Sequence, residues 1–188
     1  FVFQYIGRIS EEKGLLPLVK AFKKVAKNNK NIKLCIVGDI WFGSKKNSPY
    51  FTKIKDEIIS IANQVIFVGS QPITNIPKFM SMADCIIVPT ICEEAFGLVA
   101  IEAMATKRAL IVSESGGLPE VVDYSCAKIV SKENFVENLK KAMMSIIKEQ
   151  KKAKQMGIHG YNRIISKSEF QEQNYFTNFY NKIKEIDD

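Results

Sequence analysis

The sequence predicts an α/β fold with a doubly wound, mostly parallel sheet, helices on both faces of the sheet, and a helical C-terminal tail. Short apolar, β-branched runs alternate with longer amphipathic stretches. The runs are continuously hydrophobic, which is typical of strands buried on both faces of a parallel sheet. An alternation of this kind favours right-handed crossovers in a Rossmann-like open sheet.

Six apolar runs are predicted to be strands, of which the last is the weakest: Val2–Ile6, Lys33–Val37, Gln64–Val68, Cys85–Val88, Ala109–Val112 and Ala127–Val130. Five amphipathic stretches are predicted to be helices: Leu15–Ala26, Phe51–Ile61, Ile76–Met82, Gly97–Ala105 and Asn134–Ile147. Ligands of such sheets bind beyond the carboxyl ends of the strands, so the loops that follow the strands are where a site is expected.

The chain is expected to divide near residue 150, because no strand is predicted after that point. Residues 1–150 form the predicted sheet domain, and residues 151–188 form the helical tail. The stretch Tyr161–Ile186 is rich in aromatic residues, which need a surface to cover. It either packs on this domain or reaches toward a second domain outside this sequence. The polar segment Trp41–Tyr50 is predicted to be a loop that flanks the site.

The composition is that of a soluble globular protein, with 46% hydrophobic and 25% charged residues among 188. No apolar run approaches the roughly 20 residues that span a bilayer, and no signal peptide is recognised. The chain starts within a predicted strand and without a Met, so it is expected to be a fragment. Four widely spaced cysteines are interpreted as reduced core residues of an intracellular protein, rather than disulfides or metal ligands: Cys35, Cys85, Cys92 and Cys126.

The net charge of +7 raises the question of nucleic-acid binding. The lysines, however, are spread along the chain as pairs such as Lys23-Lys24 and Lys140-Lys141, with acidic residues between them. That pattern is typical of solvated helix faces, so no nucleic-acid partner is expected. Attraction to an anionic membrane surface stays open.

The first loop runs from a predicted strand into a predicted helix and carries two cations. Gly7 lets the backbone leave the strand sharply, and Arg8 and Lys13 bring positive charge to the same rim. Cations beside a helix N-terminus are a typical phosphate site. A surface Arg and Lys with no such role are an equally good explanation of this loop taken alone.

The loop after the fourth predicted strand carries two glutamates eight positions apart. Glu94 lies in the loop, and Gly97 opens a helix on which Glu102 follows. Both carboxylates can border one cleft. Glu94 could also be an ordinary helix-start acid and Glu102 a solvated one, but the apolar neighbours of Glu102 predict burial, which is costly without a partner.

The loop after the fifth predicted strand contains Gly116-Gly117 ahead of a Pro-Glu pair. Two glycines permit close approach of the backbone to a ligand. A simple turn explains them equally well.

Taken together, these motifs resemble glycosyltransferase family 4, retaining enzymes of GT-B fold. They occur in the order and spacing of that family's C-terminal, donor-binding domain, over roughly residues 1–150. The most specific is Glu94 with Glu102, seven residues lying between them. The others are Gly7-Arg8 with Lys13-Gly14, Val37-Gly38, and Gly116-Gly117-Leu118-Pro119-Glu120.

The resemblance implies a role for each matched residue. The expected catalytic residues are Arg8 and Lys13, which would hold the donor's diphosphate as a leaving group, and Glu94, which would contact hydroxyls of the transferred sugar. Glu102 would bind the ribose hydroxyls of the nucleotide. The remaining expected donor-binding residues are Gly7, Gly38, Ser70, Gln71, Phe96, Gly97 and Leu98; of these, Ser70 and Gln71 would meet the base, and Gly97 and Leu98 would offer backbone N–H groups.

The implied activity is transfer of a hexose, with retained configuration, from a nucleoside diphosphate sugar to a glycan or lipid-linked acceptor. A uridine donor, no cofactor and no metal ion are expected. The setting is bacterial polysaccharide or glycolipid biosynthesis in the cytoplasm or at the inner face of the membrane. The acceptor would bind mainly to the other domain of the enzyme, so this chain alone is expected to be inactive.

Two alternatives stay open. One is another enzyme on the same fold, such as a nucleotide-sugar epimerase or a phosphorylase, and the other is a non-catalytic scaffold or coat module derived from a transferase. The chain departs from the family pattern at Lys107 and Ala109, where Gly and Pro are usual, and a change in helix termination is expected there. His159 matches no motif and is expected to be solvated or structural.

Overall fold

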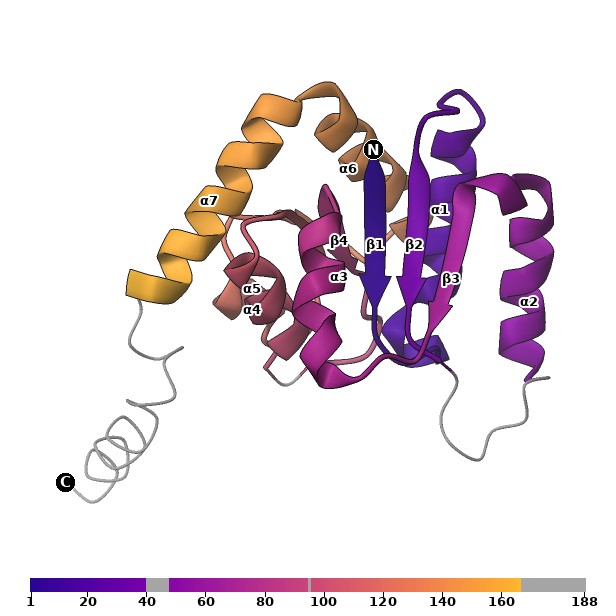
Figure 1. The fold of residues 1–188 in the computed structure, drawn as a ribbon, viewed down its shortest axis with the longest axis horizontal. Helices are drawn as coiled ribbons and strands as arrows, with labels where there is room; N and C mark the ends of the chain where they lie inside the picture. The colour runs from indigo at the N-terminus through magenta and orange to yellow at the C-terminus, as the bar shows by residue number, and fades with distance from the viewer. Residues whose placement is uncertain (40–47, 95, 167–188) are drawn as a thin grey trace, which may run out of the picture.

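The computed structural model describes residues 1–39, 48–94 and 96–166, and six parallel strands form its sheet in the order β3-β2-β1-β4-β5-β6 (Figure 1). This order confirms the predicted doubly wound, Rossmann-like sheet. The predicted loop Trp41–Tyr50 falls largely outside the described residues. The strands are β1 (Val2–Ile6), β2 (Lys33–Val37), β3 (Val65–Gly69), β4 (Cys85–Val88), β5 (Ala109–Ser113) and β6 (Lys128–Val130).

Helices cover both faces of the sheet and form two separate apolar clusters. On one face lie α1 (Leu15–Ala26), α2 (Pro49–Ile58) and α6 (Phe135–Lys148). On the other lie α3 (Ile76–Met82), α4 (Leu98–Ala105) and α5 (Leu118–Val121). Because successive side chains of a strand point to opposite faces, each strand can contribute to both clusters. In β1, Phe3 and Tyr5 belong to the first cluster, while Ile6 packs against the second.

The helix α7 (Gln150–Ser166) bridges the two clusters and packs against α4, β5 and α6 (Figure 1). Its glycines permit close contact, because a Cβ on Gly157 would lie 2.2 Å from the carbonyl oxygen of Lys107. The described part of the predicted tail therefore lies on this domain. The aromatic residues beyond 166 lie outside the described residues, and the division near residue 150 stays a prediction.

One predicted helix ends earlier than the sequence pattern suggested. We expected Phe51–Ile61, but α2 ends at Ile58 and a 3-10 segment follows (Ile59–Gln64), with non-helical backbone at Ile61 (φ −133°). Gln64, predicted to begin the third strand, is buried instead and donates from Nε2 to the carbonyl oxygen of Asn29 at 2.8 Å. The kink at Ile61 and this long-range bond of Gln64 lie between α2 and β3, which begins one residue later than predicted. The other predicted boundaries agree with the structure to within two residues.

The departure at Lys107 has a local consequence. After α4 ends, Lys107 adopts a left-handed backbone (φ 59°), which is costly for a residue other than glycine. Its ammonium lies 4.1 Å from the centre of the Tyr161 ring on α7. The family's glycine is thus replaced by a strained lysine that contacts the neighbouring helix.

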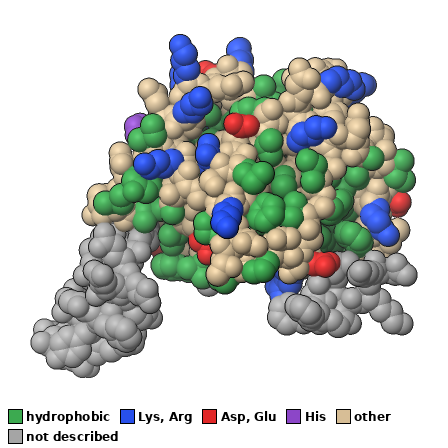
Figure 2. Space-filling view, in the orientation of Figure 1, with side chains coloured by type: hydrophobic (Ala, Val, Ile, Leu, Met, Phe, Trp, Pro, Cys, Tyr) green, Lys and Arg blue, Asp and Glu red, His purple; other side chains and the backbone are tan. Residues whose placement is uncertain are grey.

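Lysine and arginine side chains on the face in Figure 2 are spread singly among apolar and neutral groups. The sequence pattern suggested that the basic residues are spread out, and on this face they do not gather into one basic patch. None of the helices in the described ranges is both long and apolar enough to cross a bilayer.

Candidate functional site

The candidate site lies where the strand order reverses, between β1 and β4. The chain leaves β1 toward α1 on one face of the sheet and leaves β4 toward α4 on the other. The two connecting loops therefore separate at the carboxyl edge and leave a crevice between them, the usual place for a ligand in a doubly wound sheet.

Glycines bring the loops at this edge into backbone contact. Gly14 has a left-handed backbone (φ 69°), and a Cβ there would lie 1.8 Å from the carbonyl oxygen of Pro89. Beside it, the Ile91 N–H donates to the carbonyl oxygen of Glu12 at 2.7 Å. A Cβ on Gly38 would lie 1.9 Å from the carbonyl oxygen of Gly7. The loops after β1, β2 and β4 therefore form one closely packed unit.

Lys13 and Glu94 meet across the crevice, with 2.6 Å between Lys13 Nζ and Glu94 Oε2. Both side chains are largely shielded, at 29% and 21% exposed, so water screens this pair less than a surface ion pair. Thr90 Oγ1 donates to the same carboxylate oxygen at 3.2 Å. The pair places one cation and one carboxylate at the mouth of the crevice.

The loop after β5 holds the backbone of Glu94. The Gly117 N–H donates to the carbonyl oxygen of Glu94 at 2.7 Å. Gly116 is left-handed (φ 51°), and a Cβ on it would lie 2.3 Å from the same oxygen. The two glycines were predicted to let the backbone approach a ligand closely. In the described residues, they let it approach the loop that carries Glu94.

A pocket of about 360 Å³ opens between these loops and the start of α4. The first N–H groups of an α-helix have no acceptor within the helix, and Leu98 and Val99, which carry such groups, line the pocket. These donors and Lys13 together make the pocket suited to an anion. The residues that line it are Tyr5, Ile6, Gly7, Lys13, Val88, Pro89, Thr90, Glu94, Phe96, Gly97, Leu98 and Val99.

Six of the predicted site residues are thus brought together in the pocket wall: Gly7, Lys13, Glu94, Phe96, Gly97 and Leu98. Gly38 packs behind the wall on Gly7, and Ser70 and Gln71 follow β3 outside it. Arg8 is exposed at the rim, with Nη2 3.4 Å from Glu12 Oε2.

The other predicted carboxylate, Glu102, lies exposed on α4 outside the pocket wall. The burial that its apolar neighbours suggested is therefore wrong. Partial loss of hydration still raises the pKa of its carboxyl above the ordinary value. Its place on α4, four residues into the helix, leaves it accessible to a ligand that extends beyond the pocket.

Two hydroxyl groups and one lysine whose roles the sequence does not indicate hold the loop after β4. Ser113 Oγ, at the end of β5, donates to the carbonyl oxygen of Thr90 at 2.6 Å. Ser115 Oγ bonds the carbonyl oxygen of Cys92, and Lys132 Nζ bonds that of Ile91 at 3.3 Å. Small hydroxyl residues at the carboxyl ends of strands were the available signal, but spacing alone does not show which carbonyl each one reaches.

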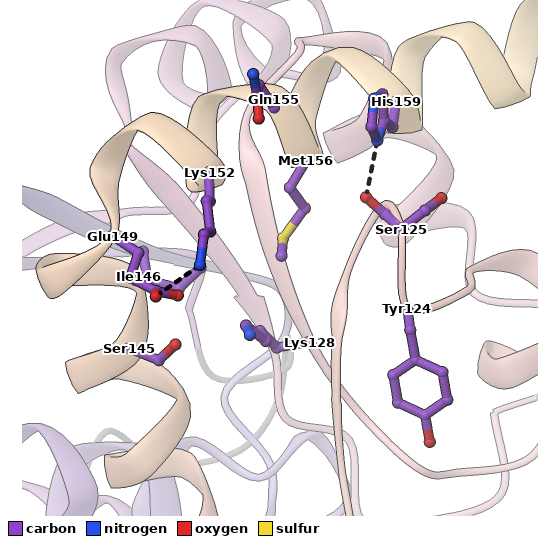
Figure 3. A pocket seen from close by; sticks show the side chains of 10 residues that line it. All are labelled: Tyr124, Ser125, Lys128, Ser145, Ile146, Glu149, Lys152, Gln155, Met156 and His159. Atoms are coloured by element: carbon purple, nitrogen blue, oxygen red, sulfur yellow. Dashed lines mark hydrogen bonds and ion pairs between the residues drawn. The ribbon is translucent and has the colours of Figure 1, made fainter.

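A second pocket, of about 270 Å³, lies between α6, α7 and the segment that enters β6 (Figure 3). His159 lines it and its Nδ1 lies 3.3 Å from the carbonyl oxygen of Ser125, a structural contact of the kind expected. Lys152 pairs there with Glu149 at 2.9 Å. Lys128, the first residue of β6, also lines this pocket. The pocket therefore lies at the amino edge of the sheet, away from the loops described above.

The four cysteines, all within the described ranges, are free thiols, as expected. Cys85 and Cys126 are buried, but Cys35 and Cys92 are only partly buried, so the prediction that all four are core residues is wrong. Burial raises the pKa of the Cys85 and Cys126 thiols. Among the residues that the structure describes, His, Cys, Asp and Glu form no group of three or more that could hold a metal ion.

Comparison with known proteins agrees with this geometry. The family described as glycosyl transferases group 1 matches residues 1–163. The chain is similar to the lipopolysaccharide 1,2-N-acetylglucosaminetransferase of Salmonella typhimurium, with 34% identity over 93% of this chain and 49% of that protein. It therefore spans about half the length of this curated relative.

Solved structures share the fold. The HepE protein of Anabaena in complex with UDP superposes with a TM-score of 0.84 at 21% identity, over 98% of this chain and 49% of that one. The C-terminal domain of a group 1 glycosyl transferase, LpcC of Francisella tularensis, gives a TM-score of 0.79 at 22% identity, over 89% and 85% of the two chains. The sheet order, the pocket at its switch point and the match over residues 1–163 together show that this chain belongs to the group 1 glycosyl transferases, the family 4 enzymes of GT-B fold.

Proposed function

We propose that this chain is the donor-binding part of a retaining glycosyltransferase that takes a hexose from a uridine diphosphate sugar. The acceptor is a glycan or a lipid-linked glycan in polysaccharide or glycolipid biosynthesis, bound mainly by a part of the enzyme outside this sequence. The reaction needs no metal ion. The enzyme works in the cytoplasm or at the inner face of the membrane.

The observation that carries the proposal is the pairing of Lys13 with Glu94 in the pocket that the start of α4 lines. To bind a nucleoside diphosphate sugar, a protein needs positive charge for the phosphates and a hydrogen-bond acceptor for the hydroxyl groups of the sugar. The pocket offers both within one ion pair, beside the N–H groups of the first turn of α4. Arg8, at the rim, is the second cation for the diphosphate.

The proposed chemistry follows from this arrangement. The bond between the sugar's C1 and the diphosphate oxygen breaks, and a new bond forms between C1 and the acceptor oxygen on the same face. The acceptor's proton passes to the departing phosphate oxygen. Lys13, Arg8 and the helix N-terminus neutralise the charge that develops on the diphosphate, and Glu94 orients the sugar.

The choice of donor and acceptor is supported by the relatives. HepE of Anabaena has been solved with UDP and, in a second structure, with UDP-glucose. The Salmonella relative is described as an N-acetylglucosaminetransferase that acts on lipopolysaccharide. Both descriptions support a uridine donor and a glycan acceptor for this chain.

A non-catalytic scaffold, the second alternative, would not need a charged pocket. The packing of three loops around Lys13 and Glu94 supports a transferase over a scaffold, because a scaffold binds no ligand for which a cation and a carboxylate must be held at an open pocket. The epimerase alternative differs in its product, and donor turnover without sugar transfer by the full-length enzyme would favour it.

Calorimetric titration of this chain with UDP, UDP-glucose, UDP-N-acetylglucosamine and GDP-mannose tests the proposal. We expect the uridine compounds to bind and GDP-mannose to bind at least about ten times more weakly. Lys13→Ala should weaken UDP binding by about 1.5–3 kcal/mol, the usual contribution of a charged hydrogen bond. The matched control is Lys152→Ala, which removes an ion-paired lysine from the second pocket. No binding across the donor panel would contradict the proposal.

A further inference from the structure

We infer that Thr90 is a positioning residue, whose hydroxyl fixes the Glu94 carboxylate so that one oxygen is reserved for the sugar. The inference rests on the proposed function of the pocket. It holds that Thr90 affects the affinity for the sugar part of the donor and not the affinity for the nucleotide part. Thr90 lines the pocket at the carboxyl end of β4 and is 1% exposed.

Among the described residues, two contacts of the Glu94 carboxylate converge on a single oxygen. Lys13 Nζ lies 2.6 Å from Oε2, and Thr90 Oγ1 lies 3.2 Å from the same atom. A carboxylate has two oxygens with about four acceptor positions in all. With Oε2 held from two directions, Oε1 is the oxygen presented to a ligand hydroxyl in the pocket.

Thr90 can perform this role because it is itself fixed. Its carbonyl oxygen accepts from Ser113 Oγ at 2.6 Å, and Ser113 is fully buried on β5. The threonine side chain is β-branched, so its χ1 angle has few alternatives in a closely packed site. The direction of the hydroxyl is thus set by the sheet.

Lys13 alone would fix Glu94 poorly. A lysine is a point charge on a flexible four-carbon chain, so it attracts a carboxylate without defining its rotation. Thr90 adds the second, directional contact. Loss of the hydroxyl should therefore leave the charges in place and let the carboxylate rotate, which weakens recognition of the sugar and leaves that of the diphosphate unchanged.

The test compares Thr90→Val, which replaces the hydroxyl by a methyl group of similar size, with Thr90→Ser, which keeps the hydroxyl. Thr106→Val is the control, because Thr106 Oγ1 donates to a helix carbonyl, that of Ala103 at 2.7 Å, outside the pocket wall. The probes are UDP, UDP-glucose and UDP-N-acetylglucosamine, each titrated calorimetrically into this chain. Urea unfolding of every variant reports on the fold.

We expect Thr90→Val to change the dissociation constant for UDP less than about two-fold. For the UDP-sugar that the wild type prefers, we expect an increase of about 3- to 12-fold, the size of one ordinary lost hydrogen bond. Thr90→Ser should restore most of this difference, and Thr106→Val should show none. In the full-length enzyme, KM for the donor should rise with Thr90→Val more than KM for the acceptor.

Two results would overturn the inference while leaving the proposed function intact. One is equal weakening of UDP and UDP-sugar binding by Thr90→Val, which would mean that Thr90 contacts the nucleotide or supports the fold. The other is unchanged binding of both. If wild-type chain binds none of the three probes, the proposed function fails first, and the inference fails with it.

Discussion

Lys13 and Glu94, 81 positions apart in the sequence, form an ion pair of 2.6 Å at the carboxyl edge of the sheet. Lys13 ends a 3-10 turn after β1, and Glu94 lies in the loop after β4. The pair therefore joins the two sides of the strand-order reversal and places opposite charges at the pocket mouth.

The pair should contribute measurably to folding, because both side chains are largely shielded from water. A double-mutant cycle of Lys13→Ala and Glu94→Ala, followed by urea unfolding, should give a coupling free energy of about 1 kcal/mol. The cycle of Lys152→Ala and Glu149→Ala should give less coupling, because this pair, between the turn after α6 and the start of α7, is more exposed. Equal coupling in the two cycles would show that the site pair is an ordinary surface contact.

Arg8 and its neighbour Glu12 should affect nucleotide affinity in opposite directions. Arg8→Ala should weaken UDP binding by about 1.5–3 kcal/mol, as expected for a lost charged hydrogen bond. Glu12→Ala removes the carboxylate 3.4 Å from Arg8, so UDP binding should stay the same or become tighter. Calorimetry at low and high salt measures both, and the Arg8 effect should shrink with salt. Unchanged affinity in Arg8→Ala would remove Arg8 from the site.

Glu102 should recognise the nucleotide through its ribose hydroxyls. Wild-type chain should bind 2′,3′-dideoxy-UDP about ten times more weakly than UDP, because the ribose hydroxyls are then missing. Glu102→Ala should bind the two nucleotides with nearly equal affinity. A variant that still discriminates between them as the wild type does would show that the ribose is bound elsewhere.

Gly14 should be far less replaceable than Gly69, although both have left-handed backbones. A Cβ on Gly14 would lie 1.8 Å from the Pro89 carbonyl oxygen, whereas nothing lies within 4 Å of one on Gly69. Gly69→Ala should cost about 1–2 kcal/mol of unfolding free energy, the price of the backbone conformation alone. Gly14→Ala should cost about 3 kcal/mol or more and weaken UDP binding as well. Similar losses in the two variants would mean that the loops separate easily.

The contacts of Asp123 should make stability depend on pH. The pKa of its carboxyl is lowered from 3.8, first by the hydrogen bond from the Ser125 hydroxyl and further by the Ser125 N–H and Arg163. A lowered pKa stabilises the fold above the ordinary value, and this contribution is lost as the pH falls through the lower, folded-state pKa. Asp123→Asn should therefore lower Tm at pH 7, and its difference from wild type should shrink toward pH 3.

The control for the pH experiment is Asp56→Asn, which changes an exposed acid on α2. Its difference from wild type should vary less between pH 7 and pH 3. A Tm difference for Asp123→Asn that stays constant over this range would show that the Asp123 charge does not contribute.

The strands were predictable because each is a short, mainly apolar run, and β1, β2 and β4 begin and end where the pattern placed them. The edge strand β3 follows the same pattern although Ile66 and Phe67 are exposed. The helix after β2 was less predictable. The apolar spacing continues to Ile61, but the backbone leaves the helix at Ile58, and Gln64 beyond it bonds the carbonyl oxygen of Asn29, a contact that no local pattern contains.

The site was predictable to the extent that its residues follow strands in the chain. Lys13 and Glu94 were expected at one edge, and they meet there. The role of Thr90 was not visible, because the hydrogen bond from its hydroxyl depends on how the loop folds back over four residues. Glu102 was expected to be buried from its apolar neighbours, but the helix turns it toward solvent.

The central claim is that a nucleotide sugar binds at the β1–β4 crevice. A crystal structure of this chain with UDP-glucose tests it most directly. We expect the diphosphate within hydrogen-bonding distance of Lys13 and of the N–H groups that begin α4 at Leu98, with the glucose beside Glu94. Density for the nucleotide in the pocket beside His159, or anywhere else away from Lys13 and Glu94, would contradict it.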